Sequence, residues 1–363
     1  MILSLIFLSH CSSEKNQRVQ ESIIHEKNEA ANVKFSLEKR SVLISINYPS
    51  IFVKNSDIYV YGNSIEEKKT VLKKYDKDLN LLWKKAFNIG QGPGEVGDGV
   101  HFFVYENYIY APDNTQKRVN IYDKNFNFTK FVKLVAPYYP VTFIKGGSYF
   151  ICAEETYEYQ PVKRSFRFNL VAFPTLKRKV LFKLKPFSTF NRKKQLIIYE
   201  TPGHHFFYKD EKLYFINMKN YKITVFDFEG NMLKSVKVDV DIKKVTKEMK
   251  VKWLKELMGA SYRENRFAFT DNIQPASYMI PLKKGFVVTR REGYSLECKD
   301  LIEGDFFDYG LKLIGKVQFP CCYRIFFSTL GYISRTFQYN EGNLYLVNMM
   351  DEEFCLERWR VTE

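Results

Sequence analysis

The chain has 363 residues, 45% of them hydrophobic, and a formal net charge of +15. Its length permits two domains or one large all-β domain, and its 32 Phe and 25 Tyr residues favour strands. No apolar run beyond the N-terminus is long enough to cross a membrane as a helix. The net positive charge would favour binding to an anionic surface, but no nucleic-acid-binding module accompanies it. We therefore expect a lysine-rich solvated surface and no nucleic-acid partner.

The N-terminus has the order of a bacterial lipoprotein signal. A short apolar run precedes LSHC at 8–11, and a polar, charged stretch follows. In such signals the chain is cut before the cysteine, which then carries lipid. We expect a signal segment at 1–11, lipid attachment at Cys11 and a flexible tether at 12–32, with the protein anchored in the bacterial cell envelope. The alternative is an ordinary N-terminal tail.

A ten-residue pattern recurs six times in the rest of the chain. Each copy begins with an apolar or aromatic trio, passes through polar residues or glycine, and ends in an aromatic or β-branched pair. Apolar runs of strand length around turn residues predict a β-hairpin. The copies are SIFVKNSDIY (50–59), HFFVYENYIY (101–110), VTFIKGGSYF (141–150), HFFYKDEKLY (205–214), YMIPLKKGFV (278–287) and TFQYNEGNLY (336–345).

A second hairpin follows the first in three copies, which begin at Tyr75, Tyr122 and Phe226. Each has Asp where the turn opens and Asn where it closes. Asp and Asn suit turns because their side chains bond the backbone and tolerate left-handed conformations. The pairs are Asp76 and Asn80, Asp123 and Asn127, and Asp227 and Asn231.

Two hairpins in each of six units predict an all-β fold, a six-bladed β-propeller of four-stranded antiparallel blades that spans 33–363. One blade alone cannot bury its apolar faces, so the blades must close into a ring. The alternating segment 33–46 is expected to close it by pairing with the last blade around 356–361. Four apolar residues spaced four apart predict one helical insertion near 243–258, between blades four and five. They are Val245, Met249, Trp253 and Leu257.

The stretch NIGQGPGEVGDG at 88–99 is rich in glycine and lies between the first two blades. A phosphate-binding Walker loop would continue with Lys and Ser or Thr before a helix, whereas here Glu95-Val96-Gly97 and a predicted strand follow. We therefore interpret the stretch as a turn. In it Gly90, Gly92 and Gly94 supply positive φ and Pro93 stiffens one corner.

This glycine run, the aromatic strand after it, IYAPD at 109–113 and RVNIYDKNF at 118–126 resemble the bacterial six-bladed β-propeller family related to NHL repeats. The specific part of the resemblance covers residues 50–135. Many members are lipoproteins, and most have no assigned biochemical role. The resemblance therefore implies the fold and an envelope location, and it implies no activity.

Two histidines occupy equivalent positions. His101 and His205 each begin a predicted inner strand, and each is followed by two Phe residues. His204 immediately precedes His205. NHL-type lyases, which the fold resembles, hold zinc in the channel with histidines from different blades, so a metal site at His101 and His205, with zinc or calcium, is one reading. Zinc usually needs a third protein ligand, and alternation favours packed histidines. We expect packing and no cofactor.

Residues 163–194 contain eleven Lys or Arg and no acid, interleaved with Phe. Such a surface can bind a polyanion, and an acidic glycan or a lipid surface suits an exported protein better than nucleic acid. The alternative is two amphipathic strands with basic side chains in solvent. The residues of this basic patch are Lys163, Arg164, Arg167, Lys177, Arg178 and Lys179.

The six cysteines form no C-x-x-C pair and match no zinc spacing, so buried free thiols are expected. Together these features favour a non-enzymatic envelope protein that binds a protein or glycan ligand. The alternative is a metal-dependent lyase or hydrolase centred on His101 and His205.

Overall fold

The computed structural model describes the greater part of the chain. The described ranges are 21–25, 29–43, 46–54, 56–64, 66–97, 100–105, 108–113, 115–134, 139–144, 147–159, 162–183, 187–188, 190–191, 196–199, 204–251, 267–269, 272–290, 301–320, 337–350 and 353–363. No helix within them is long and apolar enough to cross a membrane.

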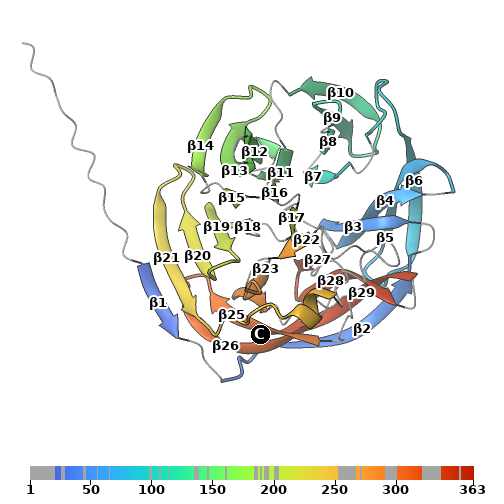
Figure 1. Cartoon of the computed structure of the whole chain (residues 1–363). Coiled ribbons are helices and arrows are strands. Elements are labelled where there is room, and N and C mark those ends of the chain that lie inside the picture. Colours follow the sequence, from blue (N-terminus) through green and yellow to red (C-terminus); the bar gives the residue numbers. More distant parts are fainter. Residues whose placement is uncertain are drawn as a thin grey trace, which may run out of the picture.

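Six antiparallel sheets stand around a common centre as the blades of a propeller, which confirms the predicted fold class (Figure 1). Blade 1 is β3 (Asn47–Lys54), β4 (Asp57–Ser64), β5 (Lys69–Tyr75) and β6 (Leu81–Asn88). Blade 2 is β7 (Phe103–Tyr105), β8 (Tyr108–Asp113), β9 (Arg118–Asp123) and β10 (Phe128–Lys133). Blade 3 is β11 (Tyr139–Ile144), β12 (Tyr149–Tyr159), β13 (Val162–Ala172) and β14 (Arg178–Lys183). A short strand β15 (Phe187–Ser188) pairs with β13.

Blades 4 and 5 are likewise built from consecutive strands. Blade 4 is β18 (His204–Lys209), β19 (Lys212–Asn217), β20 (Lys222–Phe226) and β21 (Met232–Asp239), and blade 5 is β23 (Ala276–Pro281), β24 (Gly285–Arg290), β25 (Leu301–Asp308) and β26 (Leu313–Pro320). Blade 6 combines both ends of the sequence: β27 (Phe337–Asn340), β28 (Asn343–Met350), β29 (Glu353–Thr362) and the N-terminal β2 (Lys34–Val42).

All six predicted inner hairpins form, and they share one register. The third and tenth positions of the sequence pattern lie opposite each other in every copy. The pairs are Phe52 and Tyr59, Phe103 and Tyr110, Phe143 and Phe150, Phe207 and Tyr214, Ile280 and Val287, and Gln338 and Tyr345. Cross-strand neighbours of this kind stabilise a sheet through side-chain contact, so the repeat encodes the packing of each blade's two inner strands.

The outer turns of blades 1, 2 and 4 are also confirmed. In blade 1, Asn80 donates its backbone N–H and its side-chain amide to the Asp76 carboxylate, each at 2.9 Å, and the backbone bond lowers the pKa of Asp76. The left-handed residue is not the Asp or the Asn, as we expected, but Leu79, whose φ is 58°. Its side chain is buried in the core. Blade 5 has the same turn with Lys312 in place of Asn, because the Lys312 N–H bonds Asp308 at 2.8 Å.

The predicted ring closure is confirmed. Strand β2 pairs antiparallel with β29, with Phe35 opposite Val361 and Ser41 opposite Leu356. A strand from near the N-terminus thus becomes the outermost strand of the last blade, so the two ends of the ring are joined by backbone hydrogen bonds.

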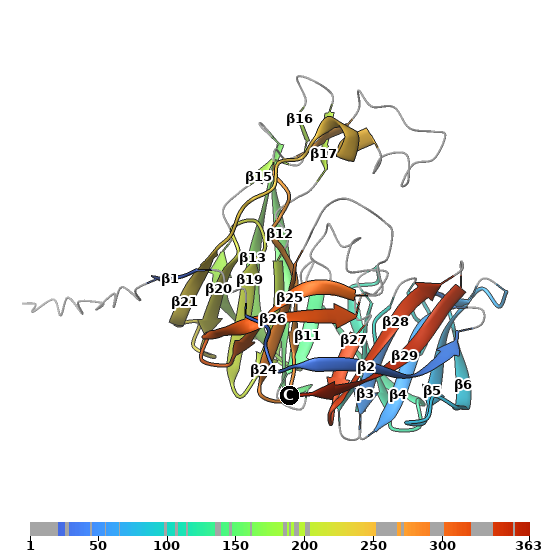
Figure 2. The same ribbon diagram turned by 90° about the horizontal axis from the view of Figure 1, so that it is seen from below.

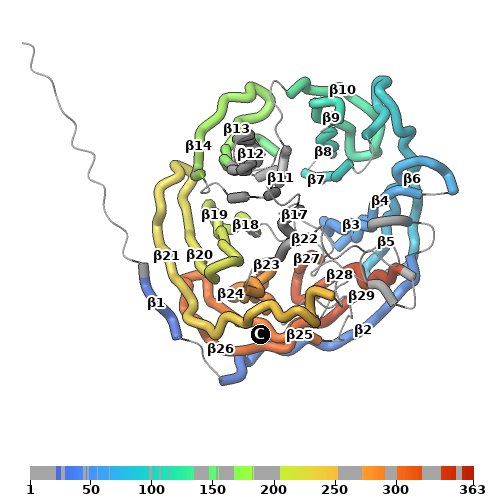
Figure 3. Tube along the Cα trace, in the orientation of Figure 1, coloured from blue at the N-terminus to red at the C-terminus, as the bar shows by residue number. Residues whose placement is uncertain are grey.

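The segment before β2 differs from the expected flexible tether. Residues Glu21–His25 form β1, which pairs parallel with β21 at the outer edge of blade 4. Further along, the Ala31 N–H bonds Lys316 O at 2.7 Å, and the Lys316 N–H bonds Glu29 O at 2.8 Å, at the edge of blade 5. The N-terminal segment therefore follows the outer edges of blades 4, 5 and 6 in turn (Figure 3). Residues 12–20 and 26–28 of the expected tether, and the expected signal segment at 1–11, lie outside the described residues.

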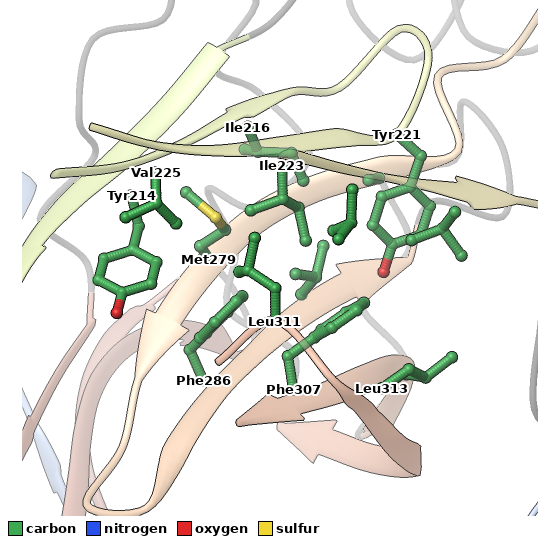
Figure 4. Packing of buried hydrophobic residues seen from close by; sticks show 14 of the residues in the cluster. Tyr214, Ile216, Tyr221, Ile223, Val225, Met279, Phe286, Phe307, Leu311 and Leu313 are labelled. Carbon is green, nitrogen blue, oxygen red and sulfur yellow. The ribbon is translucent and has the colours of Figure 1, made fainter. Parts of the chain in front are cut away.

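The core consists of buried hydrophobic clusters between neighbouring blades. Figure 4 shows the cluster between blades 4 and 5, where Tyr214 and Ile223 face Phe286 and Phe307. Within the described residues each neighbouring pair of blades shares such a cluster, including blade 6 with blade 1. Because the sequence of shared clusters returns to its start, the ring is closed by packing as well as by β2.

Two insertions that flank blade 4 in the sequence pair with each other. Strand β16 (Phe190–Asn191) pairs with β17 (Leu196–Tyr199), which pairs parallel with β22 (Phe267–Phe269). Figure 2 shows this small sheet standing away from the ring, at the end of the long β12–β13 hairpin. A helix occupies residues 247–251 of the second insertion, so a helix is present where one was predicted, but it begins at 247 and not at 243; 252–258 lie outside the described residues.

Candidate functional site

The glycine-rich stretch is a turn that docks on blade 2. Arg118 on β9 donates to the carbonyl oxygens of Gln91, Gly92 and Glu95 at 2.9–3.1 Å, and the Asn120 side chain donates to Glu95 O at 3.0 Å. The polar side chains of β9 thus satisfy the carbonyl groups of the turn, as buried backbone groups require.

Only one of the three predicted left-handed glycines has that conformation. Gly94 has a φ of +75°. Gly90 and Gly92 instead leave room for the Glu95 side chain: a Cβ added at Gly90 would lie 2.1 Å from the Glu95 carboxylate, and one added at Gly92 would lie 3.0 Å from it. The Glu95 carboxylate accepts the Gly92 N–H at 2.7 Å. This N–H is the kind of donor that a phosphate loop offers its ligand, and here the protein's own carboxylate accepts it.

Two surfaces of the ring follow from its topology. Strand direction alternates within an antiparallel blade, so the turns between first and second strands and between third and fourth strands lie together on one face, the turn face. The other turn of each blade and the connections between blades lie on the opposite face, the connection face. The β12–β13 hairpin and the small sheet therefore belong to the connection face, as Figure 2 shows.

The predicted metal-site histidines both lie at the connection face, since each precedes or begins a first strand. His101 is half-buried, and its Nδ1 lies 3.1 Å from the Tyr61 hydroxyl. His205 is 5% exposed, and its Nδ1 accepts the Met279 N–H at 3.2 Å. Burial lowers the pKa of His205 to about 3, so its ring is neutral at pH 7.

The two histidines are thus held by different neighbours, His101 by blade 1 and His205 by blade 5. The side chain of His204 lies outside the described residues. In the described ranges no three His, Cys, Asp or Glu side chains group closely enough to hold a metal ion.

The predicted basic patch lies on β13, β14 and the turn between them, and it is partly neutralised by acids outside residues 163–194. Arg167 and Arg178 each lie 3.5 Å from the Glu154 carboxylate of β12, and Lys179 lies 2.6 Å from Glu229 of blade 4. The sequence of 163–194 contains no acid, so these partners are visible only in the fold. Lys177 is exposed, and the side chains of Lys163 and Arg164 lie outside the described residues.

Two cysteines are described, Cys152 and Cys355, and both are buried thiols outside any disulfide, as predicted. Burial raises the pKa of Cys152 to about 12, so the thiol is not a nucleophile at neutral pH. Cys11, where lipid attachment was predicted, and the other three cysteines lie outside the described residues.

A groove of about 940 Å³ opens on the turn face, across blades 4, 5 and 6. Its lining comes from the inner-hairpin turns of these blades, from the outer turn of blade 5 and from the end of β29. The lining residues with polar or aromatic side chains are Tyr208, Lys209, Lys283, Lys284, Tyr309, Tyr339, Asn340, Glu341, Thr362 and Glu363.

Two of the groove tyrosines, Tyr309 and Tyr339, are fixed by hydrogen bonds. The Tyr309 hydroxyl donates to Leu282 O at 2.5 Å, and the Tyr339 hydroxyl donates to the Glu363 carboxylate at 3.2 Å. Burial, and next the Glu363 charge, raise the pKa of both tyrosines. Both therefore stay neutral at pH 7. Lys209 lies 5.8 Å from the Tyr309 ring centre, within cation–π range.

No local motif in the sequence predicts this groove. Its residues come from separate turns spread over 155 positions of the sequence, from Tyr208 to Glu363, and each turn alone is an ordinary polar loop. The only signal that bears on it is the repeat itself, which predicts that the turns of successive hairpins meet on one face.

No protein-family profile matches this chain, and no curated protein sequence does. Among solved structures, a member of the DUF4221 family from Bacteroides vulgatus has 12% sequence identity and a TM-score of 0.54, over 91% of this chain and 99% of that one. The likeness is one of fold. A Bacteroides fragilis protein described as exported has 11% identity and a TM-score of 0.48, over 95% of this chain and all of that one. A Bacteroides thetaiotaomicron protein of unknown function has 10% identity and a TM-score of 0.48, over 91% and 77%.

Proposed function

We propose that this chain is a non-enzymatic binding protein of the bacterial cell envelope, anchored by lipid on Cys11, and that its ligand binds in the turn-face groove. The observation that supports this proposal most directly is the groove itself, a concave site of about 940 Å³ to which three successive blades contribute. Concave sites with a few oriented polar groups are where proteins usually bind ligands.

The side chains of the groove suit a polar polymer, either a glycan or an extended protein segment. Tyr208, Tyr309 and Tyr339 offer large, rigid, amphipathic surfaces that lose little entropy on binding. Lys209, Lys283 and Lys284 add positive charge along the same groove. A ring of rigid blades holds these groups in place before the ligand arrives, which lowers the cost of binding.

The test of the groove is a binding screen with glycan and peptide arrays. We expect Tyr208→Ala to weaken binding of whichever ligand is found by about tenfold or more, since an aromatic contact that anchors a ligand is commonly worth at least ~1.4 kcal/mol. Tyr108→Ala is the matched control, because Tyr108 is an exposed tyrosine beside the inner turn of blade 2. Equal loss with both variants, or none with either, would contradict a binding site in the groove.

The anchor is supported by LSHC at 8–11 and is tested separately. In a bacterial host we expect the protein to sediment with membranes and to incorporate labelled fatty acid, and we expect Cys11→Ser to abolish both. Unchanged membrane association in Cys11→Ser would contradict the lipid anchor and leave the groove unaffected.

The alternative, a metal-dependent lyase or hydrolase at His101 and His205, has its own test. It requires stoichiometric zinc or calcium in purified protein that is lost in a His101→Gln, His205→Gln double variant. Metal content that does not depend on these residues would contradict it.

A further inference from the structure

The turn between β23 and β24 holds a carboxylate in the groove. The backbone N–H groups of Lys283 and Lys284 donate to the two carboxylate oxygens of Glu363, at 2.9 and 2.6 Å. The Tyr339 hydroxyl of blade 6 donates to one of the same oxygens at 3.2 Å. The Lys284 ammonium donates to the main-chain oxygen of Glu363 at 2.8 Å.

This arrangement has the chemistry of an anion site. Two successive backbone N–H groups that point to one place form a concavity for an anion, and they cost nothing to orient when it binds. The turn is already fixed by its own hydrogen bond, from the Leu282 N–H to Gly285 O at 2.7 Å. The donors therefore do not depend on Glu363 for their direction.

The anion that these N–H groups bind is the Glu363 side chain, which itself lines the proposed ligand groove. Glu363, Lys283, Lys284 and Tyr339 all line that groove, and Lys283 and Lys284 are exposed. A carboxylate that is carried by a ligand could reach the same donors by the open side of the groove.

We propose that the Leu282–Gly285 turn and Tyr339 form a carboxylate subsite of the groove, that its ligand is an acidic glycan of uronic-acid type, and that Glu363 occupies the subsite as an internal competitor. The tyrosine surfaces of the groove receive the sugar rings, and the subsite receives a uronate carboxylate in exchange for that of Glu363. The glycan assignment rests on the proposed binding function, whereas the anion subsite does not.

The subsite is tested with a small probe. In Glu363→Ala protein labelled with 15N-lysine, we expect acetate to shift the Lys283 and Lys284 amide resonances saturably, and we expect its neutral isostere acetamide to leave them unchanged. Wild-type protein should show no such shift, because the site is filled. Glu341→Ala is the matched control, since it removes an acid from the same groove and leaves Glu363 in place. No saturable acetate shift in Glu363→Ala, or an equal one in Glu341→Ala, would overturn the subsite.

A second variant covers the case in which Glu363→Ala does not fold. Glu363→Gln keeps one acceptor oxygen and removes the charge, so the same acetate titration applies to it. If neither variant takes up acetate, the subsite is refuted.

The ligand class is tested with oligosaccharides. We expect Glu363→Ala to bind oligogalacturonate at least fivefold more tightly than wild type, and neutral galactan oligosaccharides equally weakly in both proteins. Acetate binding without oligogalacturonate binding would refute the acidic-glycan ligand and keep the anion subsite. Equal affinity of wild type and Glu363→Ala for oligogalacturonate would refute the competition by Glu363.

Discussion

The ring of Phe207 lies flat on the ring of Tyr214, with 4.7 Å between centroids and 7° between planes. The two residues face each other across the inner hairpin of blade 4, and Phe52 stacks on Tyr59 in the same way in blade 1, at 4.6 Å and 13°. Phe207 also contacts Phe286 of blade 5, at 5.4 Å between centroids. One repeat position therefore fixes a hairpin and joins it to the next blade.

Replacing Phe207 tests this double role. We expect Phe207→Ala to lower the free energy of unfolding by about 3–5 kcal/mol, because it removes a buried ring from two packing contacts. Urea denaturation measures this. Tyr108→Ala, at an exposed aromatic of blade 2, should change the stability by less than ~1 kcal/mol. A similar small change for Phe207→Ala would show that the stack does not contribute to the core.

His205 should make the fold sensitive to acid. Its pKa is about 3 in the folded chain and near 6.5 when unfolded, because burial excludes the charged ring. The unfolded state thus binds a proton that the folded state does not, and stability is lost as the pH falls from about 6.5 towards 3. The contribution approaches ~1.4 kcal/mol per pH unit.

His205→Gln isolates this contribution, since its amide oxygen can still accept the Met279 N–H. We expect urea midpoints of His205→Gln to fall less steeply than those of wild type between pH 6 and pH 4. Identical slopes in the two proteins would contradict a buried neutral His205.

A buried ion pair within blade 5 is hydrogen-bonded to blade 4. Arg290 holds the fully buried Asp305 carboxylate with two hydrogen bonds, at 2.6 and 2.9 Å, and the Tyr221 hydroxyl of blade 4 donates to the same carboxylate. Arg290→Met leaves the Asp305 carboxylate without its cation in the core, so we expect the free energy of unfolding, measured by calorimetry, to fall by about 3–5 kcal/mol. The control Arg360→Met breaks an exposed pair with Glu38 and should cost at most ~1 kcal/mol. Equal effects would show that Asp305 is not buried.

The attachment of the N-terminal segment to blade 5 depends on Gly315. A Cβ there would lie 2.5 Å from Glu29 O and 2.8 Å from Ala31 N, both backbone atoms that cannot give way cheaply. We expect Gly315→Ala to speed proteolysis of the segment before β2 and to leave the ring folded. Gly310→Ala, where the nearest atom is in the flexible Asp308 side chain, should not. Unchanged proteolysis in Gly315→Ala would contradict the attachment.

The blades could be predicted because their signal is local. Each inner hairpin carries its own apolar flanks and polar turn, and the third and tenth positions of the pattern repeat in every blade. The segment ESIIH at 21–25 carries no such signal, because β1 exists only through parallel pairing with the distant β21. The turn at Asp308 was missed because Lys312 replaces the Asn of the other copies.

The groove and its anion site could not be predicted for a similar reason. Lys283 and Glu363 are 80 positions apart, and the bond between them follows from how blades 5 and 6 stand side by side. The histidine pattern was visible in sequence, but the partners that hold His101 and His205 come from other blades. Two residues that align in a repeat occupy equivalent positions in the fold, but the chemistry of each side chain depends on the residues that surround it there.

The closed ring is tested most directly by hydrogen–deuterium exchange of β2. If the ring is closed as described, the paired amides of residues 34–42 exchange slowly, together with those of β29 at 353–362. If residues 34–42 exchange within seconds while β29 and the blades stay protected, β2 does not complete the last blade and the ring is not joined as we describe.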